Sequence, residues 1–188
     1  KRYLSNPKHP NVFLGRAVVF EGPEDYHKRI NSKKLKINEN SILIIRGCGP
    51  VGYPGSAEVV NMQPPDRLLK KGINALPTLG DGRQSGTSES PSILHVSPES
   101  AVGGDLGIVK TGDKMKIDLN KRRVDLIINK SEFKKRRRNK KRFKFKNQTP
   151  WQEIFRDTVG QLEDGACINS REMYLDVSNK KGLPRDSH

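Results

Sequence analysis

Short apolar runs separated by polar and glycine-rich stretches give this chain of 188 residues its pattern. The runs at 17–20 and 41–46 predict buried strands, because aliphatic and aromatic side chains follow one another there with little polar interruption. The runs at 116–119 and 123–128 flank Asn120-Lys121, which predicts a β-hairpin. Further strand-like segments lie at residues 74–79, 91–96 and 108–109.

Helices are predicted mainly from the signals at their ends. The strongest candidate begins at Thr149, because Thr as N-cap, Pro150 at the first position and Gln152 three residues on form a capping box, and the helix is expected to run to about Asp164. Pro23 and two early acids indicate a short helix at 22–30. Other helices are predicted at 56–62, where Ser56 is able to cap, at 66–71, and at 131–141.

Many short strands with a few helices, not strictly alternating, predict an α+β fold. The length suffices for one domain with a core, and no apolar stretch approaches the ~20 residues that span a bilayer, so no membrane partner is expected. Residues 1–11 lack the apolar centre of a signal peptide. The two cysteines, Cys48 and Cys167, form no CxxC pair, which fits a cytoplasmic protein and indicates no zinc site.

Two glycine-rich loops, at residues 46–58 and 80–88, carry the candidate chemistry. Each follows a strand-like run, and glycine lets backbone approach a ligand closely because it has no Cβ. The first loop offers the carboxylate of Glu58, and the second offers Arg83 and a cluster of hydroxyls. The hydroxyls belong to Ser85, Thr87 and Ser88. A carboxylate and hydroxyls on adjacent loops are the groups of a small-molecule site with a hard metal ion.

These loops lie in a set of segments that resembles the C-terminal domain of the dihydroxy-acid dehydratase and phosphogluconate dehydratase family. The matching segments are residues 15–21, 49–55, 57–62, 80–92, 148–154 and 159–162. Within the family they look most like sugar-acid dehydratases that act on aldonates such as arabonate and xylonate. The resemblance implies a β-barrel-like core flanked by helices, similar to the swivelling domain of aconitase-type enzymes. On this basis residues 1–14 are expected to link from a missing N-terminal domain, 15–178 to form the dehydratase domain, and 179–188 to be a disordered tail.

The activity implied by the resemblance is that of a hydro-lyase, which removes water from a 2,3-dihydroxy sugar acid to give a 2-oxo-3-deoxy acid. Ser85 matches the family serine that takes the C2 proton, Thr87 a hydroxyl that binds the substrate, and Glu58 the one Mg²⁺ ligand that this domain supplies. The iron–sulfur cluster, expected as [2Fe–2S], and most magnesium ligands belong to the N-terminal domain, so the isolated chain is expected to be inactive. The family also implies a homodimer or homotetramer.

From the residues alone, simpler roles stay open. Ser85 is also suited to satisfying backbone groups in a turn, and Glu58 to facing the N-terminus of a helix. For Arg83 we favour a structural ion pair that holds its loop. Trp151 is expected to anchor its helix against the barrel or against another subunit.

Charge points in another direction, since the formal net charge is +15 and much of it lies in residues 134–146. Such a run neutralises phosphates, and the interleaved Phe143 and Phe145 suit base stacking. A solvated helix and linker explain the run equally simply, and we favour them because no nucleic-acid motif accompanies the charges. Two alternatives to a sugar-acid dehydratase therefore remain: a dihydroxy-acid dehydratase of branched-chain amino-acid synthesis, and a non-catalytic, nucleic-acid-binding descendant.

Overall fold

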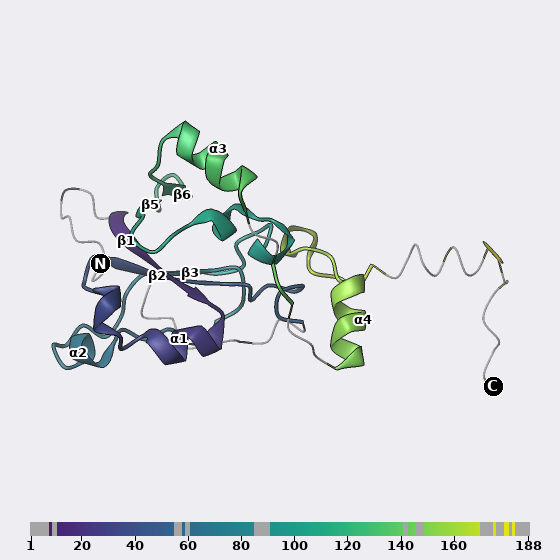
Figure 1. The fold of residues 1–188 in the computed structure, drawn as a ribbon, viewed down its shortest axis with the longest axis horizontal. Coiled ribbons are helices and arrows are strands. Elements are labelled where there is room, and N and C mark those ends of the chain that lie inside the picture. Colours follow the sequence, from purple (N-terminus) through teal and green to yellow (C-terminus); the bar gives the residue numbers. More distant parts are fainter. Residues whose placement is uncertain are drawn as a thin grey trace.

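A computed structural model of the chain contains one mixed sheet of six strands, in the order β4-β3-β2-β1-β5-β6 (Figure 1). The structure describes residues 8, 11–54, 58, 61–84, 91–140, 143–145, 149–169, 175, 179–180 and 182. The strands are β1 (Val12–Glu21), β2 (Ser41–Arg46), β3 (Thr78–Gly80), β4 (Ser92–Ile93), β5 (Lys114–Asp118) and β6 (Arg123–Leu126). The α-helices are α1 (Pro23–Arg29), α2 (Asp66–Leu69), α3 (Lys130–Arg138) and α4 (Pro150–Thr158). The 3₁₀ helices are η1 (Lys33–Leu35), η2 (Ser100–Val102), η3 (Asp105–Ile108) and η4 (Leu162–Asp164). None of the described helices is long and apolar enough to cross a membrane.

The sheet is parallel on one side and antiparallel on the other. Strands β1 to β4 run parallel, whereas β5 is antiparallel to β1 and β6 to β5. Leu79 on β3 and Met115 on β5 belong to the same hydrophobic cluster although β2 and β1 separate their strands, so the sheet curls around that cluster. The α+β prediction is confirmed, and in the described residues the barrel-like core takes the form of an open, curled sheet with β4 and β6 at its edges.

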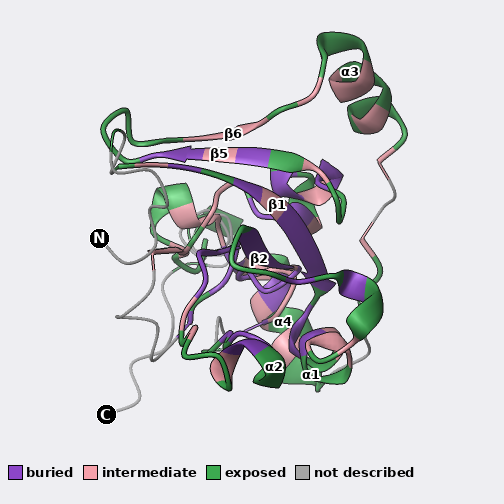
Figure 2. Ribbon diagram, turned by 90° about the vertical axis from the view of Figure 1, so that its left-hand side faces the viewer, coloured by how far each residue is buried: buried purple, intermediate pink, exposed green. Residues whose placement is uncertain are grey.

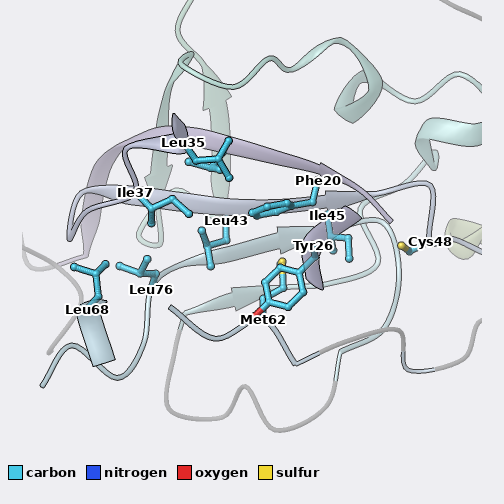
Figure 3. Packing of buried hydrophobic residues seen from close by; sticks show 11 residues of the cluster. Phe20, Tyr26, Leu35, Ile37, Leu43, Ile45, Cys48, Met62, Leu68 and Leu76 are labelled. Atoms are coloured by element: carbon cyan, nitrogen blue, oxygen red, sulfur yellow. The ribbon is translucent and has the colours of Figure 1, made fainter. Parts of the chain in front are cut away.

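Two hydrophobic clusters cover the two faces of the central strands, because successive side chains of a strand point to opposite faces. Val18 and Phe20 face a cluster that α1 and α2 complete, and Figure 3 shows Phe20 beside Tyr26 of α1. Ala17 and Val19 face the other cluster, inside the curl. The central strands are therefore buried on both sides, as Figure 2 shows for β1 and β2. Helices α1 and α2 lie on one side of the sheet and α3 on the other (Figures 1 and 2).

Several predicted elements are confirmed. Strand β2 has the predicted bounds, the hairpin forms between β5 and β6, and α1 and α3 lie within one to three residues of their predicted ranges. The capping box at Thr149 is present, with the Thr149 hydroxyl accepting from the backbone N–H of Gln152 and the Gln152 side chain accepting from that of Thr149.

Other elements differ from their predictions in extent. Strand β1 begins at Val12, inside the segment expected to be a linker, because its first half pairs with β5. This half is only partly buried, and Leu14 is 57% exposed. The apolar run at the start of β1, residues 12–14, is only three residues long and is separated from the run at 17–20 by Gly15 and Arg16. Helix α4 ends at Thr158 rather than near Asp164, since Val159 is extended and bridges to Ile168. Strands β3 and β4 cover only part of 74–79 and 91–96.

The helix predicted at 56–62 is wrong in its described positions. Glu58 forms an isolated parallel β-bridge with Arg83, and Asn61 and Met62 are in no helix. Met62 is 3% exposed within the cluster beneath α1. Burial of this side chain, together with the prolines that soon follow, opposes the helix that local propensity alone favoured at Asn61 and Met62.

Candidate functional site

The two glycine loops begin at the carboxyl ends of neighbouring strands of the sheet. The first glycine loop, residues 46–58, follows β2, and the second glycine loop, residues 80–88, follows β3. Because β2 and β3 are parallel neighbours, their carboxyl ends lie side by side, which is where open sheets of parallel strands place their ligand sites. The bridge between Glu58 and Arg83 ties the end of the first loop to the second. The structure thus brings the two loops together.

Glu58 is the one predicted site residue that lies within the described part of the chain, and it is exposed. Ser85, Thr87 and Ser88 lie outside the described residues. The Arg83 side chain is exposed and has no ion-pair partner within the described ranges, so the predicted ion pair is absent there.

The described residues contain no group of three or more His, Cys, Asp or Glu side chains that could hold a metal ion. Glu58 is one hard oxygen donor of the type that suits Mg²⁺, and the described residues alone do not build a site of three such side chains around it. Its exposure leaves its carboxylate accessible to such an ion.

Asp81, just after β3, holds the start of the first glycine loop. It is fully buried, and its carboxylate accepts from the backbone N–H groups of Gly47 (3.0 Å) and Cys48 (2.9 Å). It also accepts from the N–H and the hydroxyl of Ser100, at 2.9 and 2.5 Å. Four donors to one buried carboxylate satisfy the charge and fix the loop against η2.

Glu99 holds the middle of the same loop. Its carboxylate, also fully buried, accepts from the N–H groups of Val51 and Gly52, both at 2.8 Å, and from the side-chain amide of Gln161 at 2.9 Å. The Gln161 side-chain carbonyl accepts in turn from the Glu99 N–H. Gly49 has to lack a side chain, because a Cβ there would lie 2.5 Å from a Glu99 carboxylate oxygen. Burial raises the pKa of Glu99, and the two backbone N–H groups and Gln161 oppose that rise.

Two arginines brace the loop, one at its start and one near its middle. Arg46 donates from Nη1 to the carbonyls of Leu106, Gly107 and Val109 at 2.9–3.1 Å, and its Nε donates to Glu21. Arg156 on α4 is 8% exposed and donates from Nε to the Val51 carbonyl at 3.1 Å. The first glycine loop is thus fixed by hydrogen bonds from η2, η3 and α4, a rigid support of the kind that precise sites need.

Sequence reasoning missed Asp81 and Glu99 as the residues that shape this region. Asp81 lies within the motif that was singled out, so its place directly after a buried strand was an available signal. Glu99 lies far along the chain, next to Pro98, and only the three-dimensional structure shows that it reaches the first glycine loop.

Gln84, which directly precedes Ser85, is 7% exposed, and neither its Nε2 nor its Oε1 has a hydrogen-bond partner among the described residues. Native proteins rarely bury an amide in this way, and the cost is about 1–3 kcal/mol per group. Such a group at the entry of the second glycine loop points to a requirement other than stability.

The two cysteines cannot hold an iron–sulfur cluster by themselves, because such clusters take four thiolate ligands. Both are free; Cys48 is buried and Cys167 exposed. Burial, and then the negative charge of Asp81, raise the pKa of the Cys48 thiol far above its usual range, which disfavours the thiolate that iron requires.

Trp151 does not anchor α4 against the sheet, because 79% of its surface is exposed. Ile154, one turn further on, is 54% exposed. The prediction that Trp151 packs against the barrel is therefore wrong, since the capping box orients the first turn of α4 outward while Arg156 faces the domain.

The two glycine loops meet at the carboxyl ends of parallel strands. One carries an accessible carboxylate, and the sequence of the other carries a row of hydroxyls. This arrangement is typical of a ligand site in an enzyme domain. Comparison with known proteins identifies the family. Residues 3–166 match the family described as Dihydroxy-acid/6-phosphogluconate dehydratase C-terminal. The chain belongs to this family and corresponds to its C-terminal domain.

The chain is similar over its full length to D-xylonate dehydratase of Caulobacter vibrioides, with 54% identity over 188 residues that cover 31% of that protein. It is 48% identical over 128 residues, 68% of the chain, to L-arabinonate dehydratase of Rhizobium leguminosarum bv. trifolii, covering 22% of that protein. Identity to dihydroxy-acid dehydratase of Thermodesulfovibrio yellowstonii is 38% over 157 residues, which are 83% of the chain and 28% of that protein. The chain thus spans less than a third of each of these relatives.

Proposed function

We propose that the chain is the C-terminal domain of a hydro-lyase that dehydrates a sugar acid, a 2,3-dihydroxy acid, to a 2-oxo-3-deoxy acid. The observation that carries the proposal is the 54% identity to a protein named D-xylonate dehydratase along all 188 residues. The lower identity of 38% to a dihydroxy-acid dehydratase favours a sugar acid over the branched-chain substrate.

In this proposal the chain contributes three groups to the reaction. Ser85 takes the C2 proton of the substrate, Thr87 hydrogen-bonds the substrate, and Glu58 is a ligand of Mg²⁺. A serine hydroxyl is a weak acid, so Ser85 needs a neighbouring cation or loop amides to stabilise its alkoxide. Two observations support the role of Glu58: the residue is exposed, and it forms a β-bridge to Arg83 of the second glycine loop.

Two groups that this chain alone does not hold supply the remaining chemistry. When bound, Mg²⁺ stabilises negative charge at the substrate carboxylate, and an iron–sulfur cluster, [2Fe–2S] in this proposal, assists departure of the 3-hydroxyl. Most of their ligands are assigned to an N-terminal domain, because one carboxylate and two unsuited cysteines do not build either site in the described residues. The isolated chain is accordingly proposed to be inactive.

The buried clamps explain how this domain keeps its part of the site in order before a substrate arrives. Asp81 and Glu99 together fix four backbone N–H groups of the first glycine loop, so the chain leading to Glu58 starts from a rigid base. Such preorganisation reduces the cost of orienting a metal ligand and substrate. The whole enzyme is proposed to be a cytoplasmic homodimer or homotetramer, a location that two free cysteines suit.

The test uses the full-length gene product with the cluster reconstituted anaerobically and Mg²⁺ present. Formation of 2-oxo acid is measured with a panel of aldonates and with 2,3-dihydroxyisovalerate, for wild type, Ser85→Ala and the surface control Ser131→Ala. The proposal predicts turnover of an aldonate that is lost in Ser85→Ala, with the cluster spectrum unchanged, and retained in Ser131→Ala. Preference for 2,3-dihydroxyisovalerate would assign the branched-chain reaction instead, and no turnover by loaded protein would indicate a non-catalytic descendant.

A further inference from the structure

A cavity of about 730 Å³ lies between the first glycine loop, the start of α1, and α3 with the segment that follows it. Its size is within the range of roughly 300–1,000 Å³ in which proteins bind small organic ligands. Gly47, Gly52 and Tyr53 of the first glycine loop form one wall. Of the described residues, Glu58 and residues 80–84 do not line it, so the cavity differs from the site around Glu58.

Positive charge dominates the cavity lining. Its six cationic side chains are Arg46, Lys110, Lys135, Arg136, Lys140 and Lys144, and its acidic side chains are Glu21, Glu24 and Glu132. Arg46 pairs with Glu21, while Arg136 pairs with Glu132 and, at 2.5 Å, with Asp113. These pairs neutralise the two arginines, so the excess positive charge comes from the four lysines, which face one further acid of the lining, Glu24.

The basic run of residues 134–146 forms much of this lining, and the structure anchors it. The Lys140 ammonium donates to the carbonyls of Gly103 and Gly104, and burial lowers its pKa. Arg137 pairs with Asp105 at 3.2 Å. These contacts hold the end of α3 and the following residues against η2 and η3.

The two phenylalanines of the run are placed differently. A Cβ added at Gly47 would lie 2.6 Å from the Phe143 ring, so this ring packs directly on the glycine and lines the cavity. Phe145 does not appear in the lining and is 41% exposed; it meets Phe143 edge to face at 5.2 Å between ring centroids, and the Arg156 guanidinium lies 4.5 Å over it. Phe143 therefore forms part of the cavity wall, beside the lysines of the lining.

We propose that this cavity binds a small organic phosphate, a ligand that carries at least two negative charges. Several ammonium groups around one cavity are suited to phosphate as point charges, and Tyr53 and Phe143 offer apolar surface to an organic group. Base stacking by a polymer has less support, because the Phe143 ring packs on Gly47 and, of the two phenylalanines, only Phe145, which is 41% exposed, presents a ring to solvent.

The test is isothermal titration calorimetry at physiological salt, with pyrophosphate as the probe and the protein at its full natural length. Lys110→Gln/Lys135→Gln removes two charges that line the cavity. Lys134→Gln/Arg138→Gln removes two exposed charges of the same helix that do not line it. We expect the cavity pair to weaken binding by about tenfold or more and the control pair by less than about twofold, because charges that line the cavity lie nearest a ligand bound in it and the attraction between exposed charges falls off with distance. Circular dichroism and melting temperature verify that both variants fold.

Three results would overturn the proposal. One is the absence of saturable binding at millimolar pyrophosphate, and another is equal weakening by the two pairs, which would indicate a diffuse basic surface. The third is tighter binding of a single-stranded RNA oligomer that both pairs weaken alike, which would assign the run to nucleic acid. The Ser85→Ala variant is expected to bind pyrophosphate as wild type does, so loss of the dehydratase proposal would leave this one standing.

Discussion

Three carboxylates near the same edge of the sheet behave in two different ways. Asp81 and Glu99 are fully buried and accept every hydrogen bond from groups that belong to the first glycine loop or its supports. Glu58, at the end of that loop, is exposed. The contrast separates acids that shape the site from the acid that is accessible to a ligand.

This difference shows that the role of an acidic residue in this region has to be inferred from the hydrogen-bond donors around its carboxylate. A buried carboxylate surrounded by backbone N–H groups is already satisfied and has little left to offer a metal ion. An exposed carboxylate on a braced loop keeps its lone pairs free for coordination. The following substitutions test that division, from the largest expected effect on stability to the smallest.

Asp81→Asn is expected to have the largest effect. The amide cannot accept from all four donors, and the N–H groups of Gly47, Cys48 and Ser100 remain buried around it. We expect the free energy of unfolding to fall by about 3 kcal/mol in urea titrations. The exposed control Asp164→Asn should change it by less than about 0.5 kcal/mol. Equal effects of the two substitutions would contradict the clamp.

Glu99→Gln is expected to be milder, since the amide keeps an oxygen for part of the donor set and loses the bond from one backbone N–H. A loss of about 1 kcal/mol in the free energy of unfolding at neutral pH is expected. The measurement is again equilibrium unfolding in urea. An unchanged midpoint would mean that the Glu99 contacts with Val51 and Gly52 contribute nothing net.

The same variant has a characteristic pH dependence. Because the pKa of Glu99 is raised in the folded state, the folded protein holds this proton more tightly than the unfolded chain. The stabilisation of the folded state that comes from this proton is therefore fully present below the unfolded pKa of about 4.5, and it is lost as pH rises through the higher pKa of the folded protein. The difference in unfolding free energy between wild type and Glu99→Gln should move in favour of wild type as pH falls toward that value. If the difference in unfolding free energy did not change with pH, the pKa of Glu99 would not be raised by burial in the folded protein.

Gln84→Met is expected to stabilise the protein. The substitution removes two buried amide atoms that lack partners and keeps a similar length and volume. An increase of about 1 kcal/mol in the free energy of unfolding is expected, read from thermal or urea unfolding. Lower stability would show that the amide gains a partner in the folded protein in solution.

Trp151→Gln is expected to have the smallest effect in the 188-residue chain. A buried tryptophan contributes several kcal/mol, but 79% of this side chain is exposed, so a change below about 0.5 kcal/mol is expected. Urea unfolding of the chain tests this. A loss above about 2 kcal/mol would mean that Trp151 packs against the domain after all.

Much of the fold follows from local patterns. The uninterrupted apolar run at 41–46 predicted β2, because a strand buried on both faces has apolar residues in succession. The turn residues Asn120-Lys121 predicted the β5–β6 hairpin, because turn preferences depend on neighbouring residues. The first half of β1 was missed, since its pairing partner lies about a hundred residues away. The helix expected at 56–62 failed for a similar reason: the bridge to Arg83 and the burial of Met62 depend on distant segments.

The site was partly predictable as well. Two glycine loops following neighbouring strand-like runs were recognised from the sequence, and the structure places both at one edge of the sheet. Glu99 was not recognised, because its contacts with Val51 and Gly52 join residues almost fifty positions apart. The roles of Ser85 and Thr87 stay predictions, as both residues lie outside the described ranges.

The most direct test of the account compares Glu58→Gln with Glu39→Gln, an exposed acid just before β2, in the full-length protein with its cluster loaded. Aldonate turnover is measured against Mg²⁺ concentration, together with the unfolding midpoint. The account predicts that Glu58→Gln lowers turnover by about a hundredfold or raises the Mg²⁺ requirement strongly, with an unchanged midpoint, while Glu39→Gln retains wild-type turnover. Wild-type turnover and Mg²⁺ dependence in Glu58→Gln would contradict the claim that this exposed carboxylate is the metal ligand of the domain.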